Sequence, residues 1–152
     1  GQFHLWSDVA ILESNNVRVH KATNSTGIFQ MLDKERFDYF PRSVLEIWYE
    51  IEQYKNLDIM IEQHTLIHYP TAYYFYVNFQ NKELMNNIEK GLNAALKDGS
   101  FDSLFYQHYG EVINKARQSS HKTYELNNPH LSPKTPLDRK ELWIDLGIRS
   151  VN

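Results

Sequence analysis

The sequence contains no cysteine, no long apolar run and no cluster of basic residues. Without cysteine, disulfides, thiolate zinc sites and thiol nucleophiles are excluded, although this absence fits an oxidising compartment and the cytosol equally well. No segment reaches the roughly 18 consecutive apolar residues of a membrane-spanning helix. A formal net charge of −3 without a basic block argues against nucleic acid or an anionic membrane surface as the partner.

What is present is the composition of a folded domain. The 152 residues are 41% hydrophobic, which is enough for one ordinary domain or for two small lobes. Aromatic residues reach 14%, with 10 Tyr and 8 Phe, so we expect rings in the interior or in a cleft. The chain begins without a charged and then apolar leader, so a signal peptide is expected to have been removed or never to have been present.

A helix, a strand and a second helix are predicted in succession in the first third of the chain. Residues 37–40 are aromatic and predict a short strand, which Pro41 ends because proline has no N–H for a ladder. The S-x-x-E pattern of Ser43 and Glu46 is typical of the start of a helix. Arg42 and Ser43 are therefore expected where a strand passes into a helix, which is where ligands bind in open α/β sheets.

A second candidate contact lies near the N-terminus. Ser7 is predicted to cap a helix, and a helix start offers unpaired N–H groups to an anionic or hydroxylated ligand, with Trp6 beside it. A capped surface helix with a packing tryptophan is the structural alternative. Tyr69 ends an extended segment before a proline break that suits a hinge or crossover. The tyrosine-rich residues 73–76 are predicted to form a buried strand, or else to place one ring in the cleft.

The C-terminal half predicts helices followed by a tail. Asn81 is the expected cap of a long helix that closes at Gly99, and a further helix is expected to end at Gly110. Residues 116–135 are polar and rich in turn formers, which predicts an extended segment over the surface. A last short helix is predicted to begin at Thr135.

Two motifs resemble the bacterial extracellular solute-binding proteins of family 3, the periplasmic binding proteins of polar amino-acid ABC transporters. The first is a helix ending in Met31-Leu32 that leads into Arg-Phe-Asp-Tyr-Phe at residues 36–40. The second is the pattern EL…I…GL…DGSF…L…HYG within residues 83–110. The resemblance covers roughly residues 1–112.

The resemblance implies an α/β fold of the periplasmic binding protein-like type II class that closes on a ligand by hinge motion. On this alignment residues 1–62 are the second lobe built of βα units, residues 63–115 return to the first lobe, and residues 116–152 are a tail with a short helix. The N-terminal part of the first lobe is then lacking, so we expect a fragment. A homodimer or a strand swap could cover the exposed apolar face.

The resemblance also implies a function, namely capture of a small polar solute in an interlobe cleft, for ABC transport or sensing in the periplasm. The predicted ligand-binding residues are Trp6, Ser7, Arg42, Ser43 and Tyr69. Where amino-acid binders commonly have an Asp for the ligand ammonium, this chain has Ser43 preceded by Arg42. A guanidinium cannot bind an ammonium, but it can bind a carboxylate, a phosphate or a sugar hydroxyl.

No catalytic residue, metal site or cofactor is predicted, and the partners expected are the solute and the membrane subunits of a transporter. His64 and His68 lie four residues apart on a predicted strand without a third ligand. No Ser-His-Asp, paired-carboxylate or phosphate-loop pattern is present. Two alternatives stay open: a dehydratase-like enzyme on the same fold, with Asp8 or Glu46 as its nearest acid or base, and a non-catalytic sensor or interaction domain.

Overall fold

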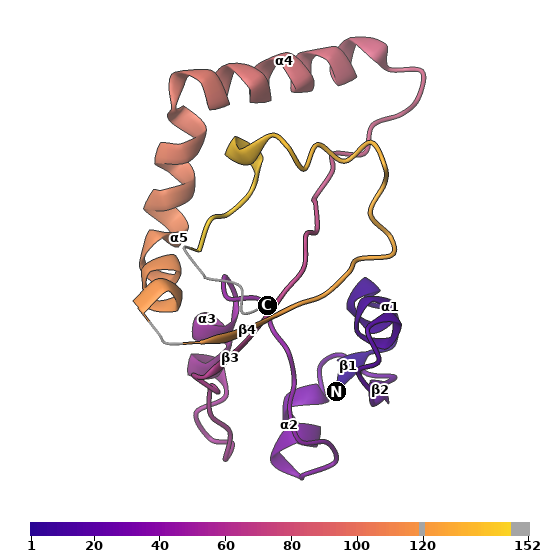
Figure 1. The fold of residues 1–152 in the computed structure, drawn as a ribbon, viewed down its shortest axis with the longest axis vertical. Helices are drawn as coiled ribbons and strands as arrows, with labels where there is room; N and C mark the ends of the chain where they lie inside the picture. The colour runs from indigo at the N-terminus through magenta and orange to yellow at the C-terminus, as the bar shows by residue number, and fades with distance from the viewer. Residues whose placement is uncertain (119–120, 147–152) are drawn as a thin grey trace.

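The chain folds as a mixed α/β protein with two small parallel sheets, and the computed structural model describes residues 1–118 and 121–146 (Figure 1). Within these residues, no helix combines the length and apolar character needed to cross a membrane. The elements in chain order are β1 (Gln2–Phe3), α1 (Ser7–Ser14), β2 (Lys21–Ala22), α2 (Ile28–Asp33), α3 (Ile47–Gln53), β3 (Thr65–His68), α4 (Lys82–Asp98), α5 (Ser100–Gln118), β4 (Lys122–Glu125) and the 3-10 turn η1 (Lys140–Leu142).

The N-terminal part is organised around α1. β1 and β2 pair in parallel with α1 as the crossover between them, which makes a small β–α–β unit. The apolar residues Val9, Ile11 and Leu12 of α1 are buried, and Ile28 at the start of α2 is fully buried. Burial of these aliphatic side chains removes them from water and holds the first two helices in place.

The second sheet joins segments that are far apart in the sequence. β3 and β4 pair in parallel, with Thr65 opposite Lys122 and His68 opposite Glu125. The connection between them carries α4 and α5, so β4 brings the tail back beside the segment that leads into these helices (Figure 1). The predicted polar tail therefore contains a strand that its composition did not indicate.

α4 and α5 meet at a sharp corner beyond the two sheets (Figure 1). The side chain of Asn81 accepts a hydrogen bond from the backbone N–H of Leu84, and Gly99 ends α4 in the left-handed conformation with φ 78°. Both predicted boundaries of α4 are confirmed. No residue of α4 is buried, whereas α5 buries Val112, Ile113 and Ala116 in its last turns.

Three predictions for the first third of the chain are wrong. Residues 37–40 form no strand. Their rings pack against aromatic rings of other segments instead: the ring centroids of Phe37 and His20 are 5.6 Å apart, and those of Phe40 and Phe29 are 5.2 Å apart. α3 begins at Ile47 and has no side-chain cap, because Glu46 pairs with Arg42 instead of turning back to Ser43. α1 begins at Ser7 itself, and its start carries no side-chain cap.

Three predictions for the rest are also wrong. α5 continues through Gly110 to Gln118, because the turns beyond the glycine bury apolar side chains. Tyr73 and Tyr76 are each 96% exposed, so they do not belong to a buried strand. No helix begins at Thr135; within residues 135–146 the structure has the 3-10 turn η1, and Trp143 Nε1 donates a hydrogen bond to the carbonyl of Pro136 at 3.0 Å. Residues 119–120 and 147–152 of the predicted tail lie outside the described residues.

The accessible surface of the chain is much larger than that of a compact protein of the same mass. Its accessible surface is 11725 Å², whereas a compact monomer of 18.0 kDa exposes roughly 8,000 Å². Several large apolar side chains on α4 and α5 contribute to this excess, including Leu84, Leu92 and Leu104. These helices therefore lack a covering layer in the structure.

Candidate functional site

Two of the segments predicted to form the site come together at the start of α1. The Trp6 and Phe40 rings lie parallel, with centroids 6.1 Å apart and planes inclined by 4°. The Arg42 guanidinium carbon is 5.0 Å from the Trp6 ring centroid and 5.3 Å from that of Phe40. A cation at this distance from aromatic rings is attracted by their electron-rich faces. The loop before α3 and the residue before α1 therefore share one surface.

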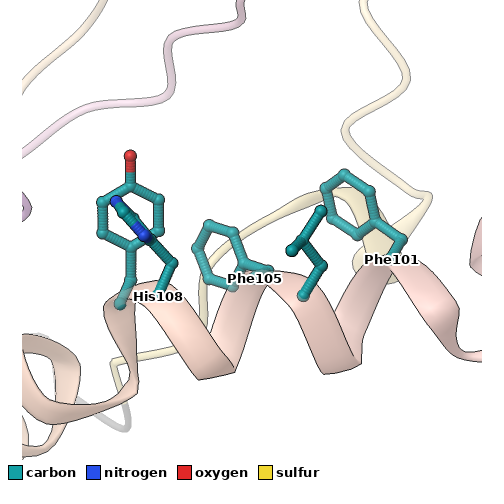
Figure 2. A pocket seen from close by; sticks show the side chains of 5 residues that line it. Phe101, Phe105 and His108 are labelled. Atoms are coloured by element: carbon teal, nitrogen blue, oxygen red, sulfur yellow. The ribbon is translucent and has the colours of Figure 1, made fainter.

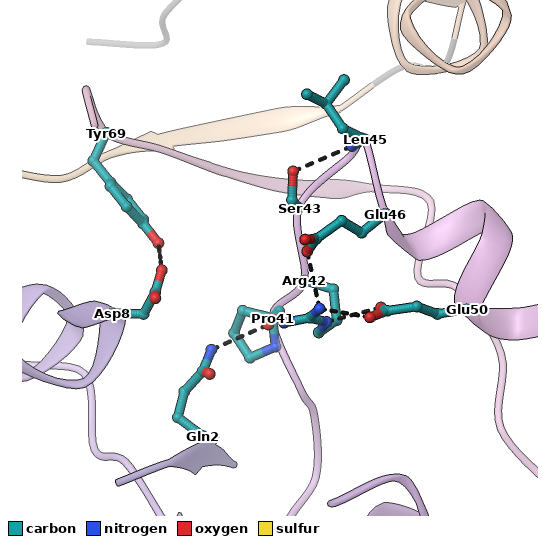
Figure 3. Close-up of polar contacts among 9 residues, drawn as sticks. All are labelled: Gln2, Asp8, Pro41, Arg42, Ser43, Leu45, Glu46, Glu50 and Tyr69. Atoms are coloured by element: carbon teal, nitrogen blue, oxygen red, sulfur yellow. Dashed lines mark hydrogen bonds and ion pairs between the residues drawn. The ribbon is translucent and has the colours of Figure 1, made fainter. Parts of the chain in front are cut away.

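Arg42 is held by two carboxylates from α3 and its preceding turn (Figure 3). Its Nε and Nη2 donate to the two Glu50 oxygens at 2.8 and 2.5 Å, and Nη2 also donates to Glu46 at 2.9 Å. Burial lowers the pKa of Arg42, but the hydrogen bonds and charge of Glu50, together with the charges of Glu46 and Asp8, raise it above its usual value overall. The guanidinium is thus a fixed, permanently charged part of the surface.

The charges around Arg42 do not favour an anion there. Glu46 and Glu50 carry two negative charges against the one positive charge of the guanidinium. The hydrogen bonds to Glu46 and Glu50 use Nε and Nη2, and the two N–H groups of Nη1 are further donors of the guanidinium. Such donors suit a neutral acceptor, such as a hydroxyl or carbonyl oxygen, better than a carboxylate.

Tyr69 connects the segment after β3 to α1 (Figure 3). Its phenol donates a short hydrogen bond to the Asp8 carboxylate across 61 residues of sequence. Burial, the hydrogen bond to Asp8 and the negative charge of Asp8 together raise the pKa of Tyr69 well above its usual value. Tyr69 therefore stays a neutral donor, and it places the end of β3 beside the start of α1.

The two predicted serines occupy the edge of this surface. Ser43 is exposed, and its hydroxyl accepts a hydrogen bond from the backbone N–H of Leu45 at 3.2 Å. Ser7 is the first residue of α1 and is also exposed. Gln2 of β1 holds the loop that carries Arg42 and Ser43, because its Nε2 donates a hydrogen bond to the carbonyl of Pro41 at 3.1 Å (Figure 3).

Two residues that shape the site, Glu50 and Phe40, were not among the predicted site residues, and Asp8 was named only as an acid or base of the enzyme alternative. Asp8 and Glu50 are the partners of Tyr69 and Arg42, and Phe40 stacks on Trp6. One of them carried a signal, since Arg42, Glu46 and Glu50 are spaced by four residues, the interval at which opposite charges pair along a helix. Nothing in the sequence pointed to the contact between Asp8 and Tyr69.

A hollow on α5 lies apart from the predicted site residues. It measures about 340 Å³ and is lined by Phe101, Leu104, Phe105, His108 and Tyr109. All five side chains come from α5 and stand in a row along it (Figure 2). It is therefore an uncovered apolar helix face. In the part of the chain that the structure describes, no group of three or more His, Asp or Glu residues is arranged to hold a metal ion.

Comparison of the chain with protein-family models, with curated proteins and with solved structures gives no match. The functional proposal therefore depends on the residues of this surface and on the motifs that the sequence contains.

Proposed function

We propose that the chain is part of an extracytoplasmic solute-binding protein of the periplasmic binding protein-like type II class. In this proposal residues 1–62 form the second lobe, and residues 63–115 return to the first. The protein captures a small polar solute between the lobes, for transport by the membrane subunits of an ABC transporter or for sensing. The proposal places the protein in the periplasm.

The convergence of Trp6, Arg42 and Tyr69 carries this proposal. These residues come from the start of α1, the loop before α3 and the end of β3, so they join residues of the proposed second lobe with the segment that returns to the first lobe. Contacts with Phe40 and Asp8 hold them in place before any ligand arrives. Preorganised polar groups beside aromatic rings are typical of small-molecule sites.

The polar contacts favour binding without chemistry. A general base needs a carboxylate that can take up a proton from the substrate. Here Glu46 and Glu50 accept hydrogen bonds from Arg42, and Asp8 accepts one from Tyr69, so each of the three carboxylates is already engaged. This engagement supports a binding protein over the dehydratase-like alternative.

A thermal-shift screen of the chain with amino acids, dicarboxylates and sugars tests the proposal. A solute that binds the folded state at about 100 times its Kd adds about 2.7 kcal/mol of stability, which raises the melting temperature clearly. We expect at least one class to stabilise the chain. No stabilisation across the panel would contradict solute binding.

The site assignment is tested by Arg42→Ala, with Arg18→Ala as the matched control. Arg18 is an exposed arginine between α1 and β2. We expect Arg42→Ala to weaken binding of the best solute by about tenfold or more, and Arg18→Ala to leave it unchanged. Circular dichroism of both variants checks that they fold. Equal affinities in a folded Arg42→Ala variant would show that Arg42 does not contribute to binding.

A further inference from the structure

A pocket of about 500 Å³ lies between three segments that the predicted site only partly includes. Ser7 of α1 lines one side, and the tyrosine-rich segment after β3 lines another through Tyr74. The tail closes the third side, and its Thr135 hydroxyl lies 3.3 Å from the phenol oxygen of Tyr74. In Figure 1 the tail passes α1 and then turns alongside the segment that leads to α4. The volume is within the range of about 300–1,000 Å³ for small-molecule sites.

Hydrogen bonds fix the tail in this position. The Asn15 side chain at the end of α1 donates a hydrogen bond to the backbone carbonyl of Asn127 at 2.8 Å and accepts one from the backbone N–H of Asn127 at 2.9 Å. This pair of hydrogen bonds resembles the pairing between two neighbouring strands. Asn128 Nδ2 donates to the carbonyl of Pro70 at 2.8 Å. The tail is thus attached to both of the other segments, and the pocket does not depend on a ligand to bring its sides together.

The lining is rich in hydroxyl groups and carries positive but no negative charge. None of the described residues that line the pocket has a carboxylate, whereas the lining includes the basic residues Lys134 and His130. Tyr74 and Tyr76 also line the pocket, and because both side chains are largely exposed their ring faces are open to a solute. Hydroxyl donors come from Ser7, Thr71, Tyr74, Tyr76, Ser132 and Thr135.

This chemistry is opposite to that around Arg42. There, two glutamates outweigh one arginine, so an anionic group is disfavoured. In the pocket, Lys134 is within the lining and no carboxylate opposes it. Ser7, which lines the pocket, follows Trp6 directly in the chain, so both surfaces begin at the start of α1.

We propose that this pocket binds the carboxylate end of a polyhydroxylated acid, such as a sugar acid, and that the tail residues Lys134 and Thr135 determine this specificity. The inference rests on the proposed solute-binding function and names its ligand class. Lys134 pairs with the carboxylate, the hydroxyl side chains exchange hydrogen bonds with the solute hydroxyls, and the tyrosine rings pack against its C–H face.

Isothermal titration calorimetry of the chain with D-glucuronate and D-glucose tests this inference. The two sugars share their ring hydroxyls and differ in the carboxylate of glucuronate. We expect tighter binding of glucuronate, and Lys134→Gln should weaken it by about ten- to hundredfold because one charge-assisted contact is lost. Lys134→Gln should leave glucose binding unchanged. Lys97→Gln, at the far end of α4, is the control and should change neither.

Three outcomes would overturn the inference. The sugars could bind equally well, Lys134→Gln could leave glucuronate binding intact, or neither sugar could bind. If another class of solute stabilises the chain in the thermal-shift screen with the same affinity in Lys134→Gln, the tail pocket is wrong while solute binding stands. If no solute of any class stabilises the chain, both proposals fail together.

Discussion

At the scale of single residues, the contact between Tyr69 and Asp8 connects α1 to the exit from β3. It is a hydrogen bond to a charged acceptor and is partly shielded from water. Removing the phenol hydroxyl leaves the Asp8 carboxylate without this donor, and a partly buried carboxylate that loses a donor destabilises the folded state. Tyr69 is therefore expected to contribute to stability as well as to the candidate site.

Tyr69→Phe should lower the free energy of unfolding by about 1.5 kcal/mol, measured by urea denaturation. Tyr73→Phe is the matched control. Tyr73 is exposed, so loss of its hydroxyl should not change the free energy of unfolding measurably. The pKa of Tyr69 is raised in the folded state, so its contribution is complete below the unfolded value of about 10 and is lost as the pH rises through the folded value. The difference between the parent chain and Tyr69→Phe should thus be equal at about pH 7 and pH 9. Equal stability of parent and variant would show that the contact contributes nothing.

Arg42 shows how a local pattern can indicate a helix start without giving its surroundings. The sequence predicts that Arg42 lies between a strand and a capped helix, whereas the structure has a loop before α3 with no strand ahead of it and no side-chain cap. The stacking of Phe40 on Trp6 joins residues that are far apart in sequence, and no local pattern reports such a contact. The contact between Asp8 and Tyr69 was not predicted for the same reason.

At the scale of elements, the corner between α4 and α5 depends on one glycine. Gly99 has φ 78°, a conformation that costs residues with a side chain about 1–2 kcal/mol. Gly91 lies inside α4, and a Cβ added there would meet nothing within 4 Å. Replacing each glycine by alanine should therefore change the stability of α4 in opposite directions.

Gly99→Ala should lower the free energy of opening of α4 by about 1 kcal/mol, and Gly91→Ala should raise it by about 0.5–1 kcal/mol because alanine is the better helix former. Amide hydrogen exchange in α4 measures both changes, and each kcal/mol corresponds to about a fivefold change in protection. A Gly99→Ala variant with unchanged exchange would mean that the corner does not require the left-handed conformation.

Elements with strong local signals were predicted, and those formed by distant pairing were not. Asn81 and Gly99 marked the bounds of α4, and the helix expected to end in Met31-Leu32 corresponds to α2. β4 was missed because its pairing with β3 is set by chain topology rather than by composition. The prediction that α5 ends at Gly110 was wrong. The helix continues because burial of apolar side chains beyond Gly110 outweighs the low helix propensity of glycine.

At the scale of the whole molecule, the exposed surface is the dominant feature. The excess over a compact monomer is larger than the roughly 800 Å² per partner that a stable interface covers. Part of it lies on helices whose apolar side chains are exposed, such as the row along α5 (Figure 2). Contiguous apolar faces of this kind associate in water.

The isolated chain is therefore expected to self-associate, and sedimentation velocity should show species above 18.0 kDa that increase with concentration. Leu104→Lys should reduce this association because it places a charge in the α5 row, where Leu104 is 69% exposed. Leu5→Lys is the control, since Leu5 is 72% exposed but lies outside α4 and α5. A monomer at all concentrations, or equal effects of the two variants, would contradict this expectation.

The most direct test of the solute-binding account is amide hydrogen exchange of the chain with and without its most stabilising solute. The account predicts slower exchange at residues 6–8, in the loop at residues 41–43 and from Tyr69 through residue 76. These segments are distant in sequence but adjacent at the start of α1. Protection confined to α4 and α5, or unchanged exchange throughout the chain, would contradict it.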